Sequence, residues 1–172
     1  MFLVLFVGAL CFGISLIIQN PEFYQSSESN NSDLVFDAMQ FYTNDNFDAT
    51  VDEQQLIQIL GAPEKTEEWN YDTETKSYPI KTLYYNNETY AYHFNAERLQ
   101  RISINDVEIP YANKNKILSM FNLKKYKNTF VVADTGVAYR VKNCGVHGLW
   151  IAIMDEDSLD SIRIDYGTLF SE

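Results

Sequence analysis

The sequence predicts an α+β protein in which two helix-plus-antiparallel-meander repeats form a curved sheet with the helices on one face, preceded by an N-terminal apolar anchor helix. Three observations predict this fold class. A helix with signals at both ends, over residues 50–60, is followed by short strands of alternating polarity. A similar order of helix and strands recurs after Pro110. The sequence also starts with a continuous apolar run.

Residues 1–19 are the predicted transmembrane anchor or signal segment. As a helix, the apolar run Met1–Ile18 would be about 27 Å long, which is enough to cross a bilayer. A cleaved signal peptide carries a basic start and small residues at its cleavage site. Here no Lys or Arg precedes the run, and Gly13 and Ser15 are followed by further apolar residues. We therefore favour an uncleaved single-pass anchor, and cleavage stays open as the alternative.

A polar linker at residues 20–31, rich in Ser and Asn, is expected to separate the anchor from the first helix-plus-meander unit, residues 32–108. Ser32 is the expected N-cap of a helix that reaches Tyr42. Its predicted buried stripe consists of Leu34, Val35, Ala38, Met39 and Tyr42.

The helix at residues 50–60 carries the clearest local signals. Thr50 and Glu53 fit a capping box, in which each side chain satisfies a backbone N–H at the helix start. Gly61 stands where a helix commonly ends in a left-handed residue, and Pro63 prevents continuation. The expected apolar face consists of Leu56, Ile57 and Leu60.

An antiparallel meander is expected after this helix, with Trp69 and Tyr71 in a leading edge strand. Three strands follow at residues 81–86, 89–94 and 99–104, and they are joined by turns at Asn86-Asn87 and Asn95–Glu97. Their alternation predicts one face directed toward the helices. That face consists of Leu83, Tyr85, Tyr90, Tyr92, Phe94, Ile102 and Ile104.

The second unit, residues 109–172, is predicted to be a degenerate copy of the first. A helix at residues 114–121 is followed by strands at 129–133, 137–142 and 149–154, and by a last strand around Ile162 and Ile164. The two copies align by polarity. Tyr90, Tyr92, Phe94, Ile102 and Ile104 of the first correspond to Leu149, Ile151, Ile153, Ile162 and Ile164 of the second.

Residues 50–104 resemble the SmpA/OmlA-type module, on the strength of Leu60-Gly61-Ala62-Pro63, the pair Trp69 and Tyr71, and the aromatic strands that follow. The same unit occurs in tandem in the β-lactamase-inhibitor-protein-like fold. The second unit matches weakly, since it lacks the L-G-x-P signature. The resemblance implies an exported, membrane- or lipid-anchored, non-enzymatic module that binds proteins through a sheet face. Leu10 before Cys11 departs from a lipoprotein signal, so lipidation is not implied.

Composition and motifs argue against several kinds of function. The net charge of −11 disfavours nucleic-acid binding, because phosphate contacts need a basic surface. We predict no catalytic residues, no metal site and no cofactor. His93 and His147 lack metal-ligand spacing, and the neighbourhood of Cys144 and His147 looks like a turn rather than a thiol–base pair. We also expect no small-molecule substrate.

The predicted functional surface is the sheet face opposite the helices. It should carry Tyr84, His93, Arg101, Arg140, Trp150 and Arg163. Tyr, Trp and Arg are the residue types most favoured at protein interfaces, although an ordinary solvated sheet face is an equal alternative.

The leading function is a membrane-tethered extracytoplasmic protein-binding or scaffolding module without catalysis. Its expected partner is another envelope or secreted protein. The expected location is the bacterial cell membrane, with residues 1–18 as a single pass and the folded domain outside the cytoplasm. The alternative is an inhibitor or immunity protein that blocks a secreted enzyme or toxin.

Overall fold

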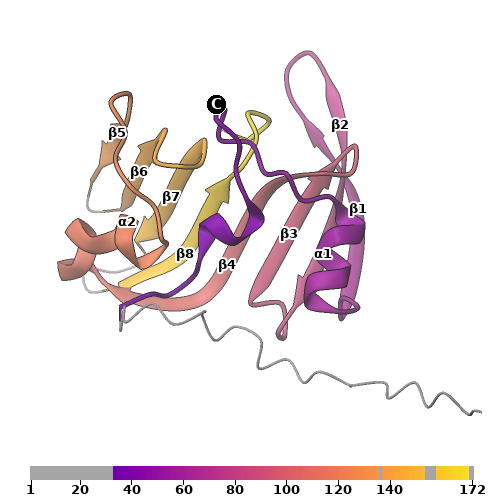
Figure 1. Ribbon diagram of the computed structural model, residues 1–172, viewed down its shortest axis with the longest axis horizontal. Helices are drawn as coiled ribbons and strands as arrows, with labels where there is room; N and C mark the ends of the chain where they lie inside the picture. The colour runs from indigo at the N-terminus through magenta and orange to yellow at the C-terminus, as the bar shows by residue number, and fades with distance from the viewer. Residues whose placement is uncertain (1–32, 136, 154–157, 171–172) are drawn as a thin grey trace, which may run out of the picture.

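The computed structural model describes residues 33–135, 137–153 and 158–170, and shows an α+β protein dominated by one eight-stranded antiparallel sheet. The strand order is β1-β2-β3-β4-β8-β7-β6-β5, so two meanders meet where β4 pairs with β8 (Figure 1). The strands are β1 Lys65–Asp72, β2 Ser77–Tyr85, β3 Tyr90–Asn95, β4 Arg98–Pro110, β5 Phe130–Asp134, β6 Ala138–Lys142, β7 Gly148–Ile153 and β8 Ser158–Asp165.

Short helical elements cover one face of this sheet (Figure 1). They are the 3-10 helix η1 Ala38–Phe41, the α-helix α1 Glu53–Leu60, the 3-10 helix η2 Tyr111–Lys116 and the short helix α2 Ile117–Met120. Phe41, Leu56 and Ile117, one from each of η1, α1 and α2, enter the same buried cluster as the inward side chains of the strands. The helical layer and the sheet therefore enclose one hydrophobic core.

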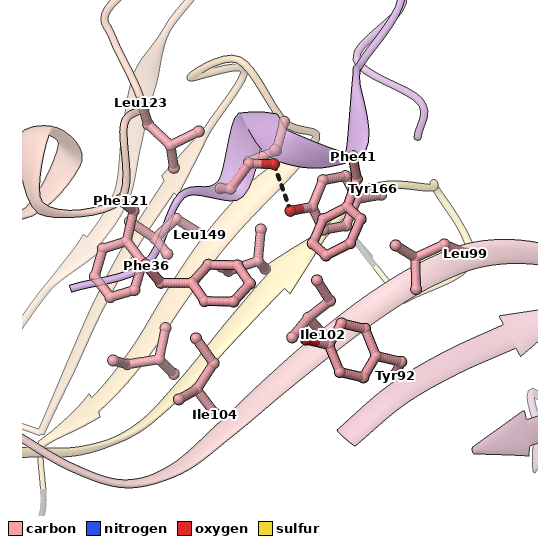
Figure 2. Packing of buried hydrophobic residues seen from close by; sticks show 14 of the residues in the cluster. Phe36, Phe41, Tyr92, Leu99, Ile102, Ile104, Phe121, Leu123, Leu149 and Tyr166 are labelled. Atoms are coloured by element: carbon pink, nitrogen blue, oxygen red, sulfur yellow. Dashed lines mark hydrogen bonds between the residues drawn. The ribbon is translucent and has the colours of Figure 1, made fainter. Parts of the chain in front are cut away.

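Most of the expected inward residues of the strands are buried. One that is not is Val137, which the alternation of residues 137–142 directs inward but which is 71% exposed. In the first meander the buried residues are Leu83, Tyr85, Tyr92, Phe94, Ile102 and Ile104, with Tyr90 half-buried at the margin. In the second they are Val141, Leu149, Ile151, Ile162 and Ile164. Figure 2 shows this packing together with Tyr166, whose buried hydroxyl donates to the carbonyl of Ala38 at 2.7 Å. That bond ties η1 to the segment that follows β8.

Helix α1 forms where the sequence predicts it, but with a different cap. Asp52, not Thr50, is the N-cap, and a capping box joins its side chain to Gln55. Thr50 lies outside the helix and donates its hydroxyl proton to the carbonyl of Tyr42. The predicted end at Gly61 is confirmed, with φ of +85° and its N–H bonded to the carbonyl of Ile57.

The predicted helix from Ser32 to Tyr42 is reduced to the single turn η1. Val35 and Phe36 donate their backbone N–H groups to the carbonyl of Met120, so this stretch docks on α2 instead of bonding within a helix. Asp37 caps η1 in place of Ser32, which lies outside the described residues. Tyr42 ends the turn with φ of +49° and is 77% exposed, so its predicted burial is wrong.

Several strands differ from their predicted limits: β1 and β2 begin earlier, at Lys65 and Ser77, and β4 continues to Pro110, whereas β6 begins one residue later than predicted, at Ala138. The pairing of β1 with β2 confirms the leading edge strand. The turns at residues 86–88 and 96–97 are present, and all of these residues have positive φ angles. Asn, which occupies two positions of the first turn, tolerates this conformation.

The two edge strands differ in character. β1 is exposed and charged, while β5 exposes the consecutive apolar residues Phe130, Val131 and Val132. The pairing of β5 with β6 is interrupted by an irregularity between Val131 and Ala133.

The predicted anchor and linker, residues 1–31, lie outside the described residues. Of the helices that the structure describes, none has the length and apolar character needed to cross a membrane.

Candidate functional site

The face of the sheet that points away from the helices, here termed the open face, holds all six residues predicted for partner binding. Residues paired directly across antiparallel strands point to the same face. One row crosses the sheet in the order Tyr84, Ala91, Ser103, Arg163, Trp150 and Arg140. The adjacent row runs in the order Thr82, His93, Arg101, Asp165 and Gly148. The structure therefore brings the predicted residues together in two neighbouring rows.

Arg163 and Trp150 form a stacked pair near the middle of the open face. The guanidinium carbon of Arg163 lies 4.0 Å from the centroid of the Trp150 ring, which is cation–π geometry. Burial and the nearby charge of Arg101 lower the pKa of Arg163. An arginine still remains protonated at neutral pH, because its usual pKa is so high. The pair therefore presents a fixed positive charge on an aromatic support.

Arg101 pairs with the only buried carboxylate described in the structure. Its Nε donates to Oδ1 of Asp165 at 2.6 Å, and Asp165 is 1% exposed. Burial raises the pKa of Asp165, and this outweighs the opposing effect of the arginines around it. A Cβ at Gly148 would stand 3.3 Å from Asp165 Oδ2, so the glycine leaves room for this carboxylate. The ion pair is thus enclosed within the sheet face.

Phe170 closes one end of the open face over β1 to β4. It is 6% exposed, and its ring contacts Tyr71, Trp69 and His93 at centroid distances of 4.8, 6.4 and 6.3 Å. Arg101 stacks on the same ring at 4.3 Å and donates from Nη2 to the carbonyl of Phe170. We call these side chains the Phe170 cluster. The segment after β8 thereby covers part of the face that the sequence predicts to be open.

A chain of hydrogen bonds runs from the Phe170 cluster toward the centre of the open face. Trp69 Nε1 donates to Thr82 Oγ1 at 2.9 Å, and Thr82 Oγ1 lies 3.0 Å from His93 Nδ1. His93 Nε2 lies 3.0 Å from Ser103 Oγ. Burial, followed by the charges of Arg101 and Arg163, lowers the pKa of His93 to about 4. His93 is therefore neutral at physiological pH.

Tyr84 lies at the β2 end of its row, opposite the end that Arg140 occupies, and is next to β1. Its hydroxyl donates to Glu67 at 2.7 Å, and Lys65 lies over its ring at 4.8 Å. Burial and the bond to Glu67 raise the pKa of Tyr84 to about 12. The phenol therefore stays protonated, and Tyr84 contributes an aromatic surface with a donor already engaged.

The other groups considered for chemistry lie elsewhere. Burial raises the pKa of Cys144 to about 11, and its backbone N–H donates to the carbonyl of Val146. His147 Nε2 instead contacts Asp48 Oδ1 at 2.9 Å. Within the described ranges, no group of three or more His, Cys, Asp or Glu side chains is arranged to hold a metal ion.

Sequence reasoning missed four residues that shape the open face: Thr82, Ser103, Asp165 and Phe170. Alternation in the strand at residues 99–104 already puts Ser103 with Arg101, opposite Ile102 and Ile104, although not as a binding residue. It could have placed Thr82 in the same way, since Thr82 lies next to the inward Leu83. The position of Phe170 had no such signal, because it depends on the path of the chain after β8.

Comparisons of the chain with profiles of protein families, with curated proteins and with solved structures found no match.

Proposed function

We propose that this chain is a membrane-tethered, extracytoplasmic protein-binding or scaffolding module without catalysis, and that the open face binds an acidic segment of another envelope or secreted protein. One observation carries the proposal. Three of the four arginines of the chain, Arg101, Arg140 and Arg163, lie on the open face of a protein whose net charge is −11. Arg101 is paired with Asp165, so Arg140 and Arg163 give the open face its positive character, which favours a partner of opposite sign.

The composition of the open face supports a protein partner. Trp150 and Arg163 are stacked, and Tyr84 adds a second aromatic side chain in the same row. Aromatic side chains provide much contact area for little loss of conformational freedom, and the guanidinium of Arg stacks on them while it donates paired hydrogen bonds; both are enriched among residues that dominate interface energetics. A rigid sheet also holds these groups at fixed spacing.

The predicted tether supports the proposed location. The apolar run at residues 1–18 is long enough to act as a single-pass anchor, and the polar linker at residues 20–31 would let the folded part stand away from the bilayer. These features support the proposal that the protein belongs to the bacterial cell membrane, with its folded part outside the cytoplasm.

We also infer that the two meanders are tandem copies of one helix-plus-meander unit, similar to the SmpA/OmlA-type module as arranged in the β-lactamase-inhibitor-protein-like fold. The strand order supports this, because it reads outward from the centre as β4 to β1 on one side and β8 to β5 on the other. At the centre, Ile102 pairs with Ile164 and Ile104 pairs with Ile162. Exchanging the two copies turns the first of these pairs into the second, so the pairing is consistent with an approximate two-fold axis that passes between Ser103 and Arg163.

Crosslinking in cells, using the full chain and the double variant Trp150→Ala/Arg140→Ala, tests the function. We expect wild type to capture a defined partner and the double variant to lose it. The control variant Tyr42→Ala/Lys124→Ala removes an exposed aromatic and a basic side chain elsewhere and should retain the partner.

Recovery of the same partners by the open-face double variant would refute the proposal. A stable complex of fixed stoichiometry with one secreted enzyme or toxin would instead identify the inhibitor or immunity function that the sequence leaves as the alternative.

A further inference from the structure

We propose that Ser103 and Arg163 form a carboxylate-binding subsite at the centre of the open face, which takes a Glu or Asp side chain from the partner's acidic segment. This inference rests on the proposed function, because it names the chemistry by which the same face recognises its partner. It rests on which atoms donate and which accept in the hydrogen-bond chain from Trp69 to Ser103. It also rests on the N–H groups of Arg163, which the described carboxylates and carbonyls do not bond.

The hydroxyl proton of Thr82 has one available acceptor in the described part of the chain. The Trp69 indole N–H can only donate, so Thr82 Oγ1 accepts that bond. Thr82 is 0% exposed, and its one remaining contact among the described residues is with His93 Nδ1. An unsatisfied buried donor costs about 1–3 kcal/mol, and Nδ1 is the acceptor within reach of the Thr82 hydroxyl proton. Thr82 therefore donates to Nδ1.

His93 carries its single ring proton on Nε2. The ring is neutral and Nδ1 accepts, so the single ring proton sits on Nε2. Nε2 must then donate to Ser103 Oγ, 3.0 Å away. In this tautomer His93 cannot accept a hydrogen bond from the Ser103 hydroxyl. Ser103 Oγ accepts the Nε2 proton of His93, so the hydroxyl proton of Ser103 must point to a group other than His93.

The hydroxyl proton of Ser103 is available to a group that arrives from solvent. Within the part of the chain that the structure describes, Ser103 Oγ has no hydrogen-bond partner other than His93. Ser103 is only partly buried, so its hydroxyl can donate to a group that arrives from solvent. The residue opposite Ser103 on β8 is Arg163, and directly paired positions place their Cβ atoms about 5 Å apart.

Arg163 supplies the charge for this subsite. Its guanidinium stacks on Trp150, and no carboxylate or carbonyl of the described residues bonds its N–H groups. The nearest buried carboxylate, Asp165, is held by Arg101. A guanidinium offers parallel N–H donors that match the two oxygens of a carboxylate, and Ser103, at the directly paired position of the neighbouring strand, adds a further donor. The occupant with the fitting charge and shape is therefore an acidic side chain.

Calorimetric titration of the full chain in neutral detergent micelles tests the subsite, with an end-blocked pentapeptide of glutamate as the probe. We expect the corresponding glutamine peptide to bind at least tenfold more weakly. Arg163→Gln should weaken binding of the glutamate peptide by at least tenfold and Ser103→Ala by about tenfold, because bonds to charged groups are the stronger class. Arg98→Gln removes the one arginine outside the open face, at the β3–β4 turn, and should change the affinity less than twofold.

Three results would overturn the subsite. One is equal affinity of wild type, Arg163→Gln and Ser103→Ala for the glutamate peptide. Another is displacement of the peptide by inorganic phosphate at an equal concentration, which would indicate an unselective anion site. The third is a nitrogen NMR spectrum in which Nδ1 of His93 carries the proton. Should Ser103→Ala fail to fold, Ser103→Cys keeps the side-chain size with a much weaker donor and provides the same comparison.

The failure of this inference is distinguishable from that of the proposed function. Loss of partner capture in the Trp150→Ala/Arg140→Ala variant, with unchanged peptide affinity in the Ser103 and Arg163 variants, would reject the subsite alone. Retained capture in that double variant would reject the function of the whole face.

Discussion

The depressed pKa of His93 predicts that the protein loses stability as the pH falls from 7 toward 4. In the folded state the pKa is about 4, because burial and two nearby arginines disfavour the charged ring. In the unfolded chain an ordinary histidine titrates near pH 6.5. Between these two pKa values, His93 is therefore protonated in the unfolded state and neutral in the folded state. The contribution of His93 is fully present above the unfolded pKa and is lost as the pH falls through the folded pKa.

The magnitude follows from the two pKa values. At pH 5 the unfolded ring is almost fully protonated and the folded ring is almost fully neutral, so the loss between pH 7 and pH 5 is about 2 kcal/mol. Below pH 4 the loss approaches a limit of about 3.4 kcal/mol, set by the full difference between the two pKa values.

Urea unfolding of the full chain in neutral detergent, followed by tryptophan fluorescence at pH 7, 6 and 5, measures this loss. The variant His93→Gln is the reference, because its amide has a donor and an acceptor for the same neighbours but does not titrate. All other titratable groups are the same in both proteins, so their effects cancel in the comparison. Wild type should lose about 2 kcal/mol more than the variant between pH 7 and pH 5. A difference under roughly 0.5 kcal/mol, or one of opposite sign, would refute the reasoning about His93.

Three further predictions test other parts of the structure. Tyr166→Phe leaves the buried carbonyl of Ala38 without its donor and should lower the free energy of unfolding by about 1–3 kcal/mol, with an unchanged denaturant slope; an unchanged urea midpoint would contradict it. Phe170→Ala removes the ring at the centre of the Phe170 cluster and should cost about 3 kcal/mol while the far-ultraviolet circular dichroism stays the same; a loss under about 1 kcal/mol would show that the ring contributes little. Cys144 should react with iodoacetamide at least about a hundredfold more slowly in the folded chain than in urea, because it is buried and its pKa is raised to about 11. Peptide mapping separates it from Cys11, and equal rates in both states would contradict its burial.

Alternation of polarity explains how much of the sheet could be predicted from the sequence. Leu149 and Ile151 point inward and Trp150 outward because a strand of this length has only two ways to place its side chains, and burial of the aliphatic set decides between them. The same argument placed the six predicted residues on the open face. Gly61 was predictable as well, because the left-handed end of a helix is a local requirement.

The features that sequence reasoning missed depend on contacts between distant parts of the chain. The stretch before η1 has the spacing of an amphipathic helix, but its backbone N–H groups bond to Met120, more than eighty residues away. The start of β1 was missed because residues 65–68 are all polar and exposed, so no alternation precedes Trp69 and Tyr71. The subsite at Ser103 requires the β4–β8 register, which pairs Ser103 with Arg163 and cannot be obtained from either strand alone.

The irregular pairing of β5 has a consequence for how the protein behaves at high concentration. An open sheet has two free edges, and an exposed apolar edge invites the same strand of another molecule to pair with it. The exposed side chains of Phe130, Val131 and Val132 make β5 the edge more prone to pair with another molecule, whereas the charged side chains of β1 disfavour such pairing. The bulge at Val132 increases the local twist and interrupts the regular spacing of donors and acceptors that fibril growth requires. Resistance to aggregation at this edge therefore comes from backbone geometry, and deleting Val132 would remove it.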